Sequence, residues 1–275
     1  MRISTNVQSM IAQRYVQHHT DDQAKEDSKL SSGSKIVHSS DDPAGLAISE
    51  KMKAMIRSNS QAERNTNDSI SLLQVAEGAL NTMQSISTRL RELAMQSATD
   101  TVSDMDRSII DKEFQQMKQE IERITASTSF NGNLIIKDSK SVYDLQIGVN
   151  GDKNLDRIHY DLGKIMDSSN NFGIAGINLR SKESSQNALS SLDKMTSEIS
   201  GSRAQLGSIN HRMDSIIQNL QVSKESLSSS NSKIRDADYA VEVAKKAISS
   251  VSQSASLALL KLSNDRPAAI LKLVS

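Results

Sequence analysis

The sequence predicts an all-α dominated fold: a long antiparallel helical bundle or coiled coil with a small β-hairpin region and no large outer domains. Small or apolar residues recur at alternating spacings of three and four from residue 188 to residue 262, which keeps one helix face toward a partner helix. Two similar patterns occur in the amino-terminal half. The 275 residues include only 3% aromatic side chains and no tryptophan, which suits a thin bundle better than a deep globular core.

A long helix is expected over residues 44–98. Asp42 can cap its amino terminus, and Pro43 suits the first helical position because a missing N–H costs nothing there. The positions expected to face other helices are Leu73, Ala76, Leu80, Met83, Ser87, Leu90 and Ala94.

A shorter helix is expected after residue 103, where Ser103 and Asp106 resemble a capping box. Its apolar face would consist of Ile110, Phe114, Met117, Ile121 and Ile124. Helices from both ends of the chain, all with narrow apolar faces, indicate an antiparallel bundle.

The pattern changes to β from about residue 134 to residue 179. Tyr143 begins an alternation of apolar and polar residues that runs to Val149, and a second alternation includes Ile158, Tyr160 and Leu162. Asn150-Gly151 lies between them and favours a short hairpin turn. This region is too small for a separate domain, so we expect it to cap one end of the bundle.

The carboxy-terminal pattern predicts one continuous helix over residues 188–262, about 110 Å long. No proline interrupts it, and Gly201 and Gly207 are its only strong helix-weakening residues. Ordinary helices in globular domains are much shorter. The sequence therefore indicates an extended protein whose helices pack within the chain or against another copy.

Composition excludes several classes of function. The 33 basic and 33 acidic residues give a net charge of +0, so we expect neither a nucleic-acid nor a membrane partner. The first thirty residues contain no apolar core of a secretory signal peptide, and no segment is apolar enough to span a membrane. The chain has no cysteine, so disulfide and thiol chemistry are not expected.

No catalytic, cofactor or metal site is predicted. No nucleophile elbow or paired catalytic spacing occurs. His18 and His19 with Asp21 and Asp22 suggest metal ligands, but adjacent histidines are expected on different helix faces and a fourth ligand is not apparent. We therefore interpret these residues as a solvated helix surface, and we do not expect an enzyme.

Motifs near both ends of the chain resemble those of bacterial flagellins. Examples are LSSGSKI at residues 30–36, RLRELA at 89–94 and RAQLG at 203–207. Further matching segments lie at residues 41–49, 61–68, 74–80, 130–132, 146–148 and 234–239. Their order along the chain, around a short variable centre, identifies the sequence as a member of this family.

The resemblance implies a domain called D0 formed by residues 1–40 and 235–275, and a domain called D1 formed by residues 41–234, with the hairpin region at about 134–179. It also implies terminal segments that are disordered in the monomer and fold on assembly. Residues 17–29 are nearly all polar, so too little apolar area is available within one chain to offset the ordering entropy. The implied function is a structural subunit that self-assembles into the secreted flagellar filament for motility.

The resemblance also implies residues and partners. The apolar helix face continues beyond the residues that the helices of D1 can bury. We therefore expect neighbouring copies to bury Leu227, Ile234, Val241, Ile248 and Leu262 on assembly. A host innate receptor for flagellin would contact Arg89, Leu93 and Glu113. The other implied partners are the flagellar type III export apparatus, an export chaperone, and the hook-associated and cap proteins.

Two alternatives remain at this point. A hook–filament junction protein would share the terminal helices, but that family resembles flagellin mainly at its extreme ends, whereas this chain also matches at residues 65–80 and 89–94. An intracellular coiled-coil scaffold would explain the helical pattern without explaining the motifs.

Overall fold

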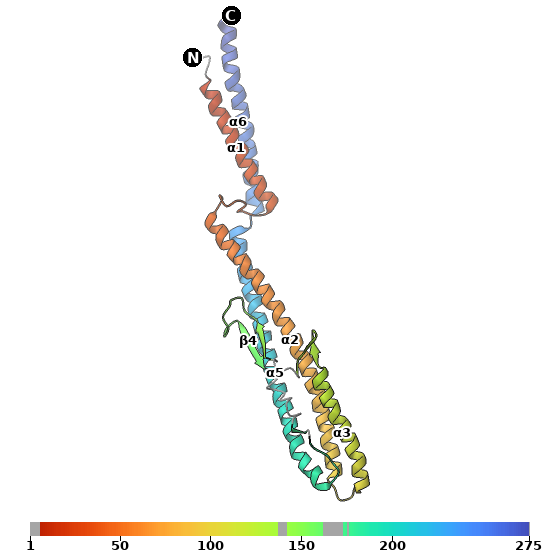
Figure 1. The fold of residues 1–275 in the computed structure, drawn as a ribbon. Coiled ribbons are helices and arrows are strands. Elements are labelled where there is room, and N and C mark those ends of the chain that lie inside the picture. The colour runs from red at the N-terminus through yellow and green to blue at the C-terminus, as the bar shows by residue number, and fades with distance from the viewer. Residues whose placement is uncertain (1–5, 137–141, 162–172, 175, 275) are drawn as a thin grey trace. The chain divides into compact units, whose positions relative to one another are not determined.

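The computed structural model describes residues 6–136, 142–161, 173–174 and 176–274 (Figure 1). The described residues contain five helices and two small antiparallel strand pairs, which confirms the all-α dominated fold. The chain forms two compact units: the first contains Met1–Ile56 and Glu225–Ser275, and the second contains Arg57–Lys224. The division into D0 and D1 at residues 40 and 235 stays a prediction.

The second unit is a bundle of three helices that share one apolar core. They are α2 (Pro43–Ser97), α3 (Asp104–Ser127) and α5 (Lys182–Arg235), of which α2 and α5 also extend into the first unit. The apolar faces predicted from the sequence are largely confirmed. The fully buried core residues include Leu73, Leu80, Met83, Leu90, Phe114, Leu192, Met195, Ile199, Leu206 and Met213.

Polar pairs, each with at least one buried member, set the register of α2 against α5. Ser87 Oγ lies 2.8 Å from Thr196 Oγ1, and the Ser185 hydroxyl donates to Ser97 Oγ at 3.0 Å. Further along the same helices, Asn59 Nδ2 donates to Ser223 Oγ at 3.2 Å. A slip of one residue would leave such groups buried without partners, so these pairs specify the alignment.

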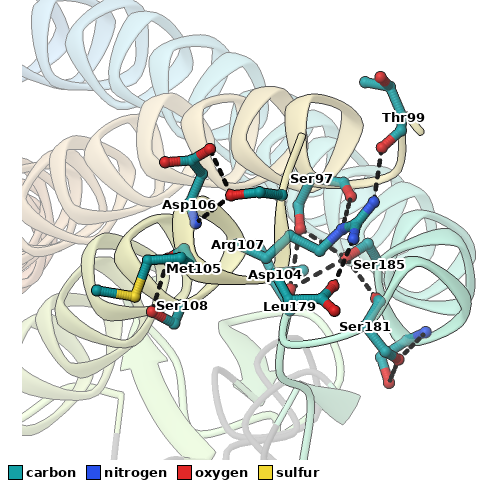
Figure 2. A network of polar contacts seen from close by, with 12 residues as sticks. Ser97, Thr99, Asp104, Met105, Asp106, Arg107, Ser108, Leu179, Ser181 and Ser185 are labelled. Carbon is teal, nitrogen blue, oxygen red and sulfur yellow. Dashed lines mark hydrogen bonds and ion pairs between the residues drawn. The ribbon is translucent and has the colours of Figure 1, made fainter. Parts of the chain in front are cut away.

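Arg107 holds together the end of the bundle where α2 turns into α3 (Figure 2). Its side chain is 7% exposed, and its guanidinium donates to the backbone oxygens of Ser97 at 3.0 Å and Thr99 at 2.7 Å. Nη1 pairs with Asp104 Oδ1 at 2.7 Å. The Ser97 hydroxyl in turn donates to the Leu179 oxygen at 2.9 Å. One cation thus satisfies carbonyl groups that the helix end leaves without intrahelical partners.

A tight hairpin follows α3. β1 (Ser129–Phe130) pairs with β2 (Asn133–Leu134), and Asn131 and Gly132 between them have φ of 50° and 81°. Positive φ at both central residues is typical of a type I′ turn, for which Asn-Gly is the preferred sequence.

The second strand pair differs from the expected short hairpin. β3 (Val142–Gln146) pairs with β4 (Arg157–Asp161), so residues 147–156 form a wide loop and Val149 lies outside the strands. The Asp152 carboxylate accepts hydrogen bonds from the backbone N–H groups of Asn154 and Leu155, which folds the loop locally instead of at Asn150-Gly151. Leu162 lies outside the described residues.

The hairpin also does not cap the bundle. It lies beside α2 and α5 (Figure 1), where Asn65 of α2 donates to the Gln146 oxygen at 3.4 Å. Ile147 and Ile158 from the hairpin join the core of the bundle. The β3–β4 strand pair therefore covers the side of the helices. The expectation that it would cap one end of the bundle is wrong.

The first unit contains α1 (Val7–Ser32) and α6 (Tyr239–Val274), which lie side by side and antiparallel (Figure 1). The single continuous helix expected over residues 188–262 is wrong, because α5 ends at Arg235 and α6 begins at Tyr239. Ser34 and Asp236 form a β-bridge at the break, and Ala237 N donates to the Gly33 oxygen. The Asp238 carboxylate accepts from Ala240 N and Val241 N, which caps α6.

Candidate assembly surface

The contact between α1 and α6 is mostly polar, with Val16 and Leu260 as half-buried apolar residues. Ser9 Oγ donates to Asn264 Oδ1 at 2.7 Å, and Gln253 Nε2 donates to Thr20 Oγ1 at 2.9 Å. The Lys246 ammonium lies 2.6 Å from Asp27 Oδ1. These contacts connect the pair along its length without an apolar core of its own among the described residues.

Most of the large apolar side chains of the same two helices are exposed to solvent. We call this set the outer apolar surface: Val7, Met10, Ile11 and Tyr15 of α1, and Val241, Val243, Ile248, Val251, Leu257, Leu259 and Leu262 of α6. Ile248 is 67% exposed and Val251 is 70% exposed. Concentrated exposed apolar residues of this kind mark surfaces for interaction.

The residues expected to be buried by assembly fall into two groups. Val241, Ile248 and Leu262 belong to the outer apolar surface and are 47%, 67% and 53% exposed. Leu227 and Ile234 on α5 are half-buried within the chain. Whether all five are buried by neighbouring copies stays a prediction.

Sequence reasoning missed the polar face of α6. Glu242 and Ser256 of α6 are buried beside α1, and Ser249 and Ser263 are half-buried; all four follow the expected apolar positions by one. A signal for this face was present, since small polar residues recur there at intervals of seven. The apolar periodicity alone pointed to the face that carries the outer apolar surface.

Two acidic side chains meet inside this polar contact. Glu242 is 4% exposed, and Oε2 of Glu242 and Oε2 of Glu26 are both buried without a hydrogen-bond partner among the described residues. The hydrogen bond that a protonated Glu26 would donate to the Glu242 carboxylate raises the pKa of Glu26, and burial adds to the increase. The same bond lowers the pKa of Glu242, together with the Lys245 ammonium at 2.7 Å. One proton shared by the pair would satisfy both buried oxygens.

The three residues expected to contact a receptor lie in the second unit, and only two of them meet at the surface. Arg89 Nη2 lies 2.8 Å from Glu113 Oε1, and Nη1 lies 3.1 Å from Glu92 Oε2. Leu93 is 1% exposed and belongs to the bundle core. Its side chain is therefore placed to stabilise the helices and not to touch a partner.

Long helices, a mostly polar contact between α1 and α6, and exposed apolar residues on both are typical of a subunit that packs against other copies. Two family descriptions match the chain: bacterial flagellin N-terminal helical region at residues 3–141, and bacterial flagellin C-terminal helical region at residues 189–274. The chain belongs to the bacterial flagellin family.

Named relatives agree over the whole chain. The flagellin of Halalkalibacterium halodurans is 38% identical over 274 residues, and the flagellar filament 30.7 kDa core protein of Treponema maltophilum is 32% identical over 288 residues. Each alignment covers 100% of both chains. A solved structure of Bacillus cereus flagellin is 28% identical, with a TM-score of 0.49, and covers 57% of this chain and 88% of that chain.

The chain is thus a structural subunit of the extracellular filament of the bacterial flagellum, the organelle of motility. Flagellins are a structural family that polymerises with itself. Neither the junction protein nor the scaffold is favoured by the family matches. None of the helices within the described residues has the length and hydropathy needed to cross a membrane.

Proposed function

We propose that the outer apolar surface is the part of this subunit that neighbouring copies cover in the filament. The observation that carries the proposal is the arrangement of α6, whose polar residues contact α1 while Val241, Ile248 and Leu262 stay exposed. Contacts between identical subunits that do not close into a ring generate a helical polymer.

The energetics of the two faces support this assignment. Burying one large aliphatic side chain stabilises by about 1.5–3 kcal/mol. Hydrogen bonds such as Ser9–Asn264 exchange water for protein partners, so each contributes only about 1 kcal/mol. Ordering the backbone costs about 1–2 kcal/mol per residue. We infer that α1 and α6, in D0, gain most of their stability from neighbouring copies. D1 instead is stabilised by its own apolar core.

The test replaces one exposed valine inside the surface and one outside it. Val251 on α6 is 70% exposed and Val222 on α5 is 66% exposed, so Val251→Gln and Val222→Gln remove similar apolar area. We expect Val251→Gln to raise the critical concentration for seeded polymerisation about tenfold, because the loss of about 1.4 kcal/mol is a factor of ten. Val222→Gln should leave it unchanged. Equal effects of the two substitutions would contradict the proposal.

Further partners follow from the same surface and from the family. An apolar face on α6 would cause premature association before export, so an export chaperone is expected to cover it. The flagellar type III export apparatus would read the amino-terminal segment, and the hook-associated and cap proteins would meet the same helices at the filament ends. Secretion that persists after deletion of residues 5–29 would contradict the export assignment.

A host innate receptor for flagellin is proposed to contact the α2–α3 face at Arg89 and Glu113. Charged groups in an exposed cluster can serve as recognition points, and arginine is enriched in binding hot spots. We expect Arg89→Ala to weaken binding of the monomer to the receptor ectodomain about tenfold or more.

The control for this measurement is Arg123→Ala, since Arg123 on α3 is also an exposed arginine, and it pairs with Glu120 at 2.6 Å. Its removal should leave receptor affinity unchanged. No detectable binding by the unaltered monomer, or equal affinities for all three proteins, would remove the receptor assignment and leave the filament function intact.

A further inference from the structure

We propose that His18, His19 and Asp22 of α1 form a binding site for one transition-metal ion of the zinc class. Within the described ranges these three residues are grouped so that one ligand atom of each lies within 4.8 Å of the others. We expected the two imidazole rings to point to different faces of the helix. The structure instead places their ligand atoms close together.

The geometry comes from side chains on consecutive turns. His18 Nδ1 lies 2.8 Å from Asp22 Oδ2, a contact at the i, i+4 spacing that brings residues onto one helix face. The rings of His18 and His19 meet edge to face, with centroids 5.8 Å apart. Ligands around a zinc ion lie about 2.0–2.2 Å from it, so small side-chain rotations suffice to close the present spacing around one ion.

The ligand types decide the class of ion. Two imidazoles and one carboxylate suit Zn²⁺, and they also suit Cu²⁺ and Ni²⁺, whereas Ca²⁺ and Mg²⁺ require mostly oxygen ligands. Three protein ligands leave a further coordination position for water or an added donor. The neighbouring Asp21 is not needed, because its Oδ1 accepts a hydrogen bond from Gln17 Nε2 at 2.9 Å.

The location of the site gives binding a mechanical effect. An ion held by His18 and Asp22 links two successive turns of α1, so metal binding favours the helical state of this segment. Tyr15 and Ile11 lie three and seven residues before His18 on the outer apolar surface. The ion would therefore stabilise α1 beside the face that we assign to assembly, although the metal site does not depend on that assignment.

The test titrates Zn²⁺ alone into the unassembled full-length chain and follows heat by calorimetry and helix content by circular dichroism. We expect one ion per chain and an increase in helicity. His18→Gln, His19→Gln and Asp22→Asn should each weaken binding about tenfold or more.

The matched control is His159→Gln. His159 Nδ1 lies 3.5 Å from Asp144 Oδ1, so it also pairs with an aspartate, but it lacks a third ligand in the described part of the chain. Its removal should change neither the affinity nor the helicity. The proposal is overturned if the unaltered chain shows no binding, or if the double variant His18→Gln/Asp22→Asn binds as tightly as the unaltered chain.

Discussion

At the scale of single residues, burial and charge conflict at Glu26 and Glu242. Each carboxyl group would be costly to bury ionised, yet each has a lysine nearby: Lys29 lies 3.9 Å from Glu26, and Lys245 lies 2.7 Å from Glu242. The raised pKa of Glu26 and the lowered pKa of Glu242 mean that the pair is most stable with one proton between them.

The sign of the pH dependence follows from these directions. The contribution of Glu26 is present below its raised pKa and is lost as the pH rises through it, whereas that of Glu242 is lost as the pH falls through its lowered pKa. The pairing of α1 with α6 is therefore strongest in a window between the two, which includes the ordinary glutamate pKa of 4.5.

Glu26→Gln should abolish the loss on the alkaline side of this window. The amide supplies a permanent donor to Glu242, so we expect filaments at neutral pH to gain about 1 kcal/mol per subunit. The check is the temperature of filament dissociation measured across a pH series. Glu225→Gln, at an exposed position of α5, should follow the unaltered protein at every pH.

At the scale of helices and strands, the sequence predicted apolar faces well and local breaks poorly. The predicted faces of α2 and α3 form the core because their periodicity extends over many turns. The break between α5 and α6 was missed because Asp238 caps the new helix without disturbing the spacing of apolar residues. The wide loop of β3–β4 was missed because Asp152 binds its own backbone more effectively than Asn150-Gly151 turns the chain.

The candidate site was predictable only in part, for related reasons. The exposed positions Val241, Ile248 and Leu262 were named from periodicity, although periodicity cannot say which face a partner in the same chain occupies. The burial of Leu93 depends on packing among α2, α3 and α5, and the proximity of His18 to His19 depends on side-chain rotamers. Neither can be obtained from spacing along one helix.

Arg107 provides a prediction about how these elements are joined. Arg107→Ala removes the donors to the Ser97 and Thr99 oxygens, so we expect the unfolding free energy of the second unit to fall by about 2–3 kcal/mol. Urea denaturation followed by circular dichroism measures this change. Arg123→Ala, whose side chain is 64% exposed, should cost less than about 0.5 kcal/mol. Similar losses of unfolding free energy for both variants would show that the contacts of Arg107 with the Ser97 and Thr99 oxygens do not stabilise the unit.

At the scale of the whole molecule, the two units differ in what stabilises them. The second unit has its own apolar core, whereas α1 and α6 of the first unit contact each other through polar groups and expose their apolar residues. We therefore expect the bundle of the second unit to fold within one chain, and α1 and α6 to gain most of their stability from identical neighbours. This difference can be measured directly.

Limited proteolysis should separate the two units according to assembly state. In the monomer we expect both ends to be trimmed back toward about residues 40 and 235, because cleavage follows local opening and polar helix pairs open readily. In the filament the same bonds should resist cleavage at equal protease concentration. Equal rates of trimming in both states would argue that α1 and α6 are stable without neighbours.

The hydroxyl and amide pairs between α2 and α5 also constrain which deletions in the gene the bundle can accept. Thirty-eight positions separate Asn59 from Ser97 on α2, and the same number separate Ser185 from Ser223 on α5. Loss of one codon from either helix would rotate every residue beyond it by about 100° and turn the paired groups away from the shared face. Loss of seven codons keeps the helical face but still shifts one end of the paired groups along the axis, so we expect such a deletion to be tolerated only when the opposite helix also loses seven.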